Sequence, residues 1–289
     1  MNARVLGVAG VGLIGGSIAL RAHAAGMRVI GFDRDPAALS AARAAGAIDE
    51  TVADLAALAE RAAVVALALP IDAVVDALTT VDALAQPQLV FDVASVKMPV
   101  AAAARRFPRF VGSHPLAGRE IGGFAAADAA LFTGRTWVVT PGGDAAARAR
   151  LAELVALFGA RSVELEPATH DRLVAATSHL PQLLSVLLGE RLAELGASDP
   201  RAYDVAGPGI ASMLRLARSP ASLWTVIARA NAGPLAAELR TAAQALETLA
   251  AELDRAEVDT LASYFARAGA AVDELDRRSV SGDSAAPRL

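Results

Sequence analysis

The chain has 289 residues, of which 54% are hydrophobic and 4% aromatic, and it carries a formal net charge of −4. This length suits one large domain or two ordinary ones, and because lysine and arginine are not concentrated in any segment, no nucleic-acid surface is expected. Cysteine is absent, which excludes disulfides, thiolate metal sites and cysteine nucleophiles and fits a cytoplasmic setting; we predict no metal site.

The N-terminal segment has the pattern strand, glycine-rich loop, helix, strand. Residues 3–9 are an apolar, valine-rich run that ends at GVGLIGGS (10–17), and an Ala-rich helical stretch follows up to Gly26. The run 27–32 predicts a second buried strand, which ends at Asp33.

The uncharged N-terminal segment mimics a signal peptide, but its glycines are poor material for a leader helix. Elsewhere no uncharged apolar run approaches the ~20 residues of a membrane span, so we expect a soluble protein without membrane contact.

This order is typical of a dinucleotide-binding unit, in which each glycine has a physical role. Gly10 permits the tight turn, Gly12 lets the backbone approach a pyrophosphate, and Gly15 lets the helix pack closely on the strand. Free amides at the helix start then face the phosphates. Asp33 can accept both ribose hydroxyls, which favours NAD over NADP, whereas Arg34 could meet a 2′-phosphate. The alternative interpretation is a packing motif of an Ala/Gly-rich helix.

Further apolar strands alternate with helical stretches and predict an α/β fold with a Rossmann-type, doubly wound parallel sheet. We expect these strands at 62–70, 89–94, 109–112, 136–141 and 161–167, with a helix over about 144–158 before the last. Ligands of such sheets bind beyond the carboxyl ends of the strands, where His114 also lies. The predicted cofactor-binding residues at this edge are Gly10, Gly12, Leu13, Ile14, Gly15, Asp33, Arg34, Pro70, Ser95 and Lys97.

Beyond residue 167 the strand signals cease and helical apolar spacing dominates. We therefore predict a dinucleotide-binding Rossmann domain over 1–167, an all-α substrate and dimerisation domain over 168–278, and a disordered tail over 279–289. So many alanine- and leucine-rich helices in a short segment are expected to bury faces against a second subunit, forming a homodimer through the helical domain.

Two features of the helical half point to chemistry. His170 and His179 are nine residues apart, which at about 100° per residue is half a turn from the same face, so one straight helix cannot present both to one site. Pro181 is expected to kink or interrupt the helix, so that His179 borders an opening. Arg215 lies in an apolar helical run and needs an anionic partner or a route to solvent.

The motifs together resemble those of the prephenate/arogenate dehydrogenase family of tyrosine biosynthesis, over roughly residues 5–235. The motifs that carry this resemblance are GVGLIGGS (10–17), DVASVK (92–97), GSHPLAG (112–118), LFTGRTWVVTP (131–141), HDRLVAATSHLP (170–181) and GPGIASMLRLARSPASLW (207–224).

The resemblance implies an NAD-dependent oxidative decarboxylation, of prephenate to 4-hydroxyphenylpyruvate or of arogenate to tyrosine. By analogy His114 accepts the proton of the ring hydroxyl as hydride departs, and Ser95 holds the same hydroxyl and orients His114. Arg215 would clamp a substrate carboxylate, since a guanidinium suits bidentate pairing. His179 would line the substrate pocket and Trp224 would close it.

The chain departs from the family pattern at positions that concern substrate choice. Gln182 replaces the second histidine of the common SHLPH motif, and Arg119 stands where a small polar residue is expected. Glu120 takes the place of a pocket-gating acid. We predict that all three line the substrate site, and both prephenate and arogenate remain open as substrates.

Several of these residues have plainer interpretations. These are a turn residue for His114, a helix N-cap for Ser95, a core histidine for His179, a helix-start residue for His170, plain core or dimer packing for Trp224, a structural ion pair for Arg215, and solvated charges for Lys97 and Glu120. Two alternative functions remain open. One is that of an oxidoreductase related to the β-hydroxyacid dehydrogenases or imine reductases, which would be expected to carry a catalytic lysine or aspartate in the helical domain. The other is that of a non-catalytic NAD(H)-binding regulator.

Overall fold

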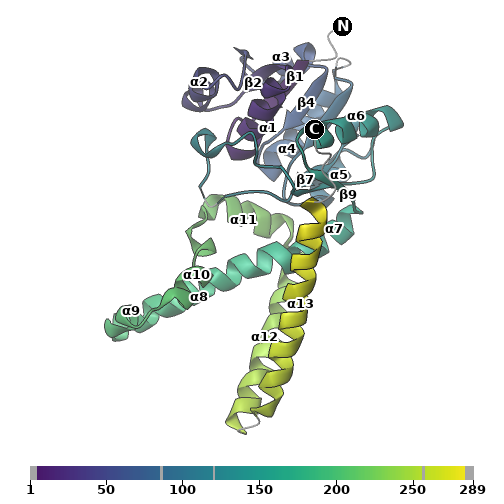
Figure 1. The fold of residues 1–289 in the computed structure, drawn as a ribbon. Helices are drawn as coiled ribbons and strands as arrows, with labels where there is room; N and C mark the ends of the chain where they lie inside the picture. Colours follow the sequence, from purple (N-terminus) through teal and green to yellow (C-terminus); the bar gives the residue numbers. More distant parts are fainter. Residues whose placement is uncertain (1–4, 85–86, 120, 256–257, 284–289) are drawn as a thin grey trace. The chain divides into compact units, whose positions relative to one another are not determined.

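A computed structural model describes residues 5–84, 87–119, 121–255 and 258–283. By their contacts the residues form two compact units, Met1–Ala232 and Gly233–Leu289, each described by itself below (Figure 1). The domain boundary predicted at residue 167 falls within the first unit. Within the described ranges, none of the helices is both long and apolar enough to cross a membrane.

A six-stranded, all-parallel sheet is the framework of the first unit. Its strands are β1 (Val5–Ala9), β2 (Arg28–Phe32), β3 (Glu50–Thr51), β4 (Val64–Leu67), β5 (Leu89–Asp92) and β6 (Phe110–Val111). They lie in the order β3-β2-β1-β4-β5-β6, the doubly wound order of dinucleotide-binding sheets. The predicted fold class is confirmed.

Helices cover both faces of this sheet because the strands are apolar on both faces. In β1, Leu6 and Val8 belong to one buried cluster, whereas Val5 and Ala9 belong to the other. This alternation is what a period of two residues produces when neither face meets water. The helices between these strands are α1 (Leu13–Ala24), α2 (Pro36–Ala44), α3 (Leu55–Arg61), α4 (Ile71–Asp82) and α5 (Met98–Ala103).

The strands expected at 136–141 and 161–167 do not join the large sheet, which corrects the sequence interpretation. A separate three-stranded sheet contains β7 (Ser113–Pro115), β8 (Thr136–Val139) and β9 (Arg161–Glu164), in which β7–β8 is antiparallel and β8–β9 parallel. The helix α6 (Ala145–Leu157) connects β8 to β9. The chain leaves the large sheet at Gly112, whose carbonyl accepts the amide of Thr140. Periodicity identifies strands, but their partners are set by tertiary packing.

The helical remainder of the first unit packs onto the sheet portion, with α7 against α5 and α11 against α4. For that reason the first compact unit continues to residue 232. Its elements are α7 (Pro167–Val174), a π-turn (Ala175–His179), α8 (Leu180–Ser198), α9 (Arg201–Asp204), α10 (Pro208–Met213), a 3₁₀ turn (Leu216–Arg218) and α11 (Ala221–Ala230).

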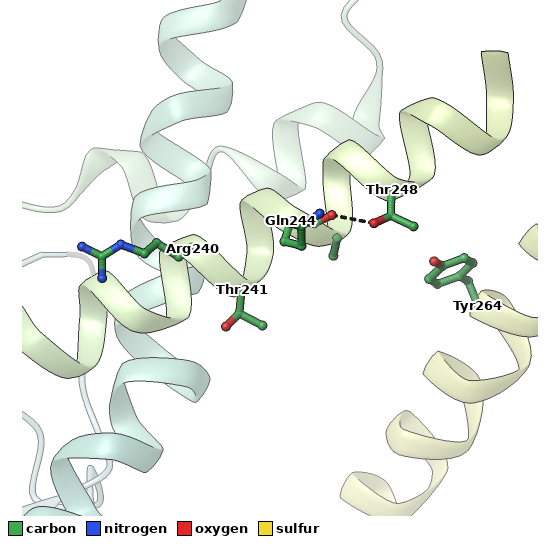
Figure 2. A pocket seen from close by; sticks show the side chains of 6 residues that line it. Arg240, Thr241, Gln244, Thr248 and Tyr264 are labelled. Carbon is green, nitrogen blue, oxygen red and sulfur yellow. Dashed lines mark hydrogen bonds between the residues drawn. The ribbon is translucent and has the colours of Figure 1, made fainter.

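The second unit contains the long helices α12 (Ala232–Asp254) and α13 (Asp259–Asp283). A pocket of about 500 Å³ is lined by Arg240, Thr241, Gln244, Ala245 and Thr248 of α12 and Tyr264 of α13. Figure 2 shows the labelled side chains of this lining from close by. The helix α13 extends into the segment where a disordered tail is expected from residue 279, and ion pairs from Glu274 to Arg277 and Arg278 stabilise its last turns. Residues 284–289 lie outside the described residues.

Candidate active site

Two glycines of the loop after β1 have no room for a side chain. Gly10 has a φ of 88°, and an added Cβ would lie 2.2 Å from the carbonyl oxygen of Ala68. A Cβ on Gly15 would lie 1.8 Å from the carbonyl oxygen of Gly10. The loop can therefore turn tightly against the end of β4 only with glycine at both positions.

Gly12 differs, because an added Cβ would meet none of the described atoms within 4 Å. Gly12 is the N-cap residue of α1, and among the described residues no side chain caps this helix. The first amides of α1, with Leu13 and Ile14 half-buried beside them, therefore open onto unfilled space. Such a helix start fits the pyrophosphate of a dinucleotide.

Asp33 follows β2 and holds the glycine loop in place. Its carboxylate accepts hydrogen bonds from the amide of Val11 at 2.7 Å and the amide of Asp35 at 2.9 Å. A carboxylate has about four acceptor sites, so capacity remains for ribose hydroxyls. Arg34 is exposed next to it, and Pro70 is the exposed N-cap residue of α4 after β4.

His114 lies on the short strand β7, opposite Val138, and not in a turn. The residue before it, Ser113, is tied to β5 because its amide and hydroxyl donate to the carboxylate and carbonyl of Asp92, at 3.0 and 2.6 Å. The buried ammonium of Lys97 donates to the Asp92 carboxylate and, at 2.6 Å, to the Ser113 carbonyl. Burial lowers the pKa of Lys97, and the charge of Asp92 opposes this. This ammonium braces the backbone beside His114, and the predicted cofactor contact of Lys97 stays a prediction.

A chain of hydrogen bonds connects His114 to a buried carboxylate. His114 Nδ1 lies 2.9 Å from His170 Nε2, and His170 Nδ1 lies 2.7 Å from the Oδ1 of Asp171. The Asp171 carboxylate also accepts the amides of Lys97 and Met98 at 2.7 and 2.8 Å. Met98 begins α5 and Lys97 is its N-cap residue. Ser95 lies half-buried in the preceding loop, so the interpretation of Ser95 as a helix N-cap is wrong.

The electrostatic surroundings keep His114 neutral. Its pKa is lowered well below the ordinary 6.5, first because burial disfavours the charged ring and then because Lys97 is close. The neighbouring imidazoles of His170 and His179 act in the same direction. A neutral imidazole has an available lone pair at physiological pH, which a general base requires.

His179 is almost fully buried, 1% exposed, beside Trp224. The two rings meet edge to face with centroids 5.7 Å apart, and His179 Nδ1 lies 3.1 Å from the side-chain Nδ2 of Asn231. Burial lowers the pKa of His179 to about 4. The π-turn before Pro181 changes the helical phase, so the half-turn separation of His170 and His179 expected on a straight helix does not apply.

The predicted substrate residues lie in different surroundings. Gln182 is buried and its side-chain nitrogen donates to the carbonyl of Leu216 at 2.7 Å, which ties α8 to the 3₁₀ turn. Arg215 is exposed at the N-cap position of that turn. Arg119 pairs with Asp128 at 2.6 Å in an exposed loop. Glu120 lies outside the described residues.

The sequence interpretation treated His170 as a helix-start residue and gave no role to Asp92, Ser113 and Asp171, which lie in the quoted motifs, or to Asn231. The residues of this network are distant in the sequence: His170 is 56 positions from His114, and Asp171 is 74 positions from Lys97. The adjacent pair His170-Asp171 at the start of a helix was the only local signal, and by itself it indicates nothing about His114.

Comparisons with known proteins agree over both halves of the chain. The model of the prephenate dehydrogenase nucleotide-binding domain matches residues 17–164, and the model of the prephenate dehydrogenase dimerization domain matches residues 166–267. The chain belongs to the prephenate dehydrogenase family. A probable prephenate dehydrogenase of Streptomyces niveus is 34% identical over 84% of this chain and 68% of its own length.

Two further known proteins are similar to most of this chain. The prephenate dehydrogenase of Bacillus subtilis is 29% identical over 89% of this chain and 72% of its own length. The crystal structure of a Synechocystis arogenate dehydrogenase superposes with a TM-score of 0.79 and 28% identity, and the match covers 94% of this chain and 99% of that chain. The protein is accordingly an oxidoreductase.

Proposed function

We propose that this protein catalyses the NAD-dependent oxidative decarboxylation of prephenate or arogenate. The observation that carries the proposal is a neutral, braced imidazole, His114, at the edge of a dinucleotide-binding sheet whose glycine loop opens onto unfilled space. The nucleotide-binding family model and the names of the relatives support the cofactor and the substrates.

In this reaction bound NAD supplies the hydride acceptor. His114 accepts the proton of the ring hydroxyl as the carbon that bears it loses hydride and becomes a carbonyl carbon. The bond to the ring carboxylate then breaks, its electron pair enters the ring, and carbon dioxide leaves. The ring becomes aromatic and the carbonyl oxygen takes back the proton from His114, so that atoms and charge balance.

The remaining site residues are proposed to hold the two ligands. For the cofactor, Gly12 would admit the pyrophosphate, and Asp33 would accept the ribose hydroxyls, which favours NAD over NADP. For the substrate, Arg215 would pair with a carboxylate, and His179 with Trp224 would form a wall of the pocket. The 3₁₀ turn that begins beside Arg215 is tied to α8 by Gln182, which lies three residues after His179, so the two substrate contacts are mechanically connected.

We further propose that the protein is a homodimer. The family model of a dimerization domain covers the helical half, and large apolar side chains are exposed there. In the first unit these include Leu187, Leu188, Leu195, Met213 and Leu223, and in the second unit Leu246, Leu253, Phe265, Val272 and Leu275. A cytoplasmic location, predicted from the cysteine-free composition, stays a prediction.

One experiment tests the reaction and the choice of substrate and cofactor. The purified protein is given prephenate or arogenate with NAD or NADP, and reduced nicotinamide is followed by absorbance, with carbon dioxide release measured in parallel. We expect turnover with NAD and at least one of the two substrates. Absence of turnover with all four combinations contradicts the proposed function.

A further inference from the structure

We propose that His170 and Asp171 are positioning residues that fix the tautomer of His114, so that its Nε2 atom is the proton acceptor. The inference rests on the proposed function for its consequence in catalysis, although the tautomer itself is a property of the unliganded protein. The inference depends on the hydrogen bonds that join His114, His170 and Asp171, and on which atom of each bond carries the proton.

The direction of these hydrogen bonds is set at the carboxylate. Asp171 accepts from two backbone amides, those of Lys97 and Met98, which have no alternative but to donate. An ionised carboxylate is an acceptor only, so the contact at 2.7 Å between its Oδ1 and His170 Nδ1 needs a proton on the nitrogen. His170 is therefore held with Nδ1 protonated.

The protonation of His170 then determines that of His114. A neutral imidazole carries one N–H, so with Nδ1 protonated the Nε2 atom of His170 has a lone pair and accepts. Its neighbour at 2.9 Å, His114 Nδ1, must then donate. The second ring nitrogen of His114, Nε2, is left with its lone pair on the side of the ring away from His170. This is the atom that can take a hydroxyl proton.

The same chain stabilises the product of proton transfer. When Nε2 of His114 gains a proton, the ring becomes cationic, and its Nδ1–H already points at an acceptor. His170 in turn is held by the carboxylate, so the positive charge is met by an aligned hydrogen bond and, through one ring, by an anion. The arrangement resembles the carboxylate and imidazole of a catalytic triad, in which the carboxylate orients the base. Here a second imidazole, that of His170, lies between the carboxylate of Asp171 and the base His114.

The geometry is rigid because every member is anchored. His170 is fully buried and Asp171 is 2% exposed, and Asp171 is tied to α5 by both carboxylate oxygens. The backbone carbonyl of Asp171 also accepts a hydrogen bond from the side-chain Nδ2 of Asn231 at 2.8 Å. On the other side, Ser113 and Lys97 brace the strand that carries His114.

Two substitutions of His170 separate its two contacts. The amide of asparagine reaches where Nδ1 lies, so His170→Asn preserves a donor to Asp171 and removes the acceptor for His114. Glutamine is longer, and its side-chain oxygen reaches where Nε2 lies, so His170→Gln preserves the acceptor for His114. We expect His170→Asn to lower kcat by ~10²-fold or more with little change in KM, and His170→Gln to retain most of kcat.

The direct readout is ¹⁵N NMR of the His114 imidazole, assigned with His114→Asn, at a pH where the ring is neutral. We expect Nδ1 to be protonated in the wild type and in His170→Gln, and the preference for this tautomer to be lost in His170→Asn. This measurement needs no substrate, so it stands apart from failure of the proposed function. A proton on Nε2 in the wild-type ring overturns the inference.

Unfolding free energies of both variants separate positioning from a structural role. Each substitution removes a buried ring, so some loss of stability is expected in both. If kcat falls equally in His170→Asn and His170→Gln and follows the loss of stability, His170 is only a packing residue and the inference is wrong.

Discussion

At the scale of single residues, the protonation of His114 is decided by neighbours and not by its own chemistry. An imidazole in water titrates near neutral pH, where half of the molecules would be charged and unable to accept a proton. Burial and nearby positive charge shift the pKa of His114 well below 6.5. The ring is therefore a base over the whole physiological range, provided that its free nitrogen faces the substrate.

The role of His114 is tested by His114→Asn, which preserves a polar side chain but cannot take up a proton. We expect this variant to bind NAD with unchanged affinity and to lose ~10²–10⁴-fold in kcat. The measurements are NAD titration by fluorescence and steady-state kinetics. Near-normal turnover would show that another group is the base, whereas lost NAD affinity would indicate a misfolded cofactor edge.

At the scale of elements, the glycine loop and the π-turn are places where the backbone departs from regular structure. Gly10 and Gly15 allow contacts that any side chain would block. The π-turn Ala175–His179 comes before Pro181, which has no amide hydrogen to donate within the helix. The helix is not interrupted at Pro181, since helical residues continue on both sides of it.

The loop offers a matched pair of substitutions. At Gly12, φ is −75° and a Cβ meets no described neighbour, so Gly12→Ala should fold with nearly unchanged stability but weaken NAD binding by occupying the space for the pyrophosphate. Gly10→Ala should lower the free energy of unfolding by more than ~1 kcal/mol, because its φ is positive and its Cβ would overlap Ala68. Chemical denaturation and NAD titration measure both. Unchanged NAD affinity in Gly12→Ala would contradict the assigned pyrophosphate position.

At the scale of the whole molecule, buried neutral histidines couple stability to pH. His179 has a pKa of about 4 when folded and an ordinary value of 6.5, so the unfolded chain binds more protons between these values. The contribution of the neutral His179 ring to the free energy of unfolding is complete above pH 6.5 and is lost as the pH falls toward 4. This shift corresponds to on the order of 3 kcal/mol, and His114 acts with the same sign.

The free energy of unfolding should therefore decrease between pH 6.5 and about 4, as measured by urea denaturation at a series of pH values. His179→Gln removes one titrating ring and should flatten this dependence, although it lowers stability at neutral pH. A pH dependence as steep in His179→Gln as in the wild type would show that His179 does not contribute.

The oligomeric state is the second prediction at this scale. The exposed leucines of α8 and the apolar side chains along α13 are expected to be covered by a second copy, because burial of each large apolar side chain is worth about 1.5–3 kcal/mol. Sedimentation equilibrium should give twice the chain mass, and Leu187→Glu together with Leu195→Glu should shift the population toward monomer. A monomer of the wild-type chain at micromolar concentration would contradict the homodimer.

Much of the fold could be predicted because its signals are local. The order of strand, glycine loop, helix, strand and Asp33 lies within one short segment, and alternating apolar strands and helices indicated the doubly wound sheet. The same local logic failed where strands choose partners. The strand that begins at Thr136 is apolar enough to join the large sheet, yet it pairs with the more polar strand that begins at Arg161 and with the strand of His114.

The sequence by itself therefore determined the class of fold and the nucleotide loop, since both depend on residue types at short spacing, and through the family resemblance it pointed to His114 as the proposed base. Only the tertiary structure decided what surrounds that base. The contact of His114 with His170 spans 56 positions, and that of Lys97 with Asp171 spans 74. Packing of α7 against the start of α5 creates the second contact and the approach of α7 to β7 creates the first, and no local pattern encodes which buried donor will face which acceptor.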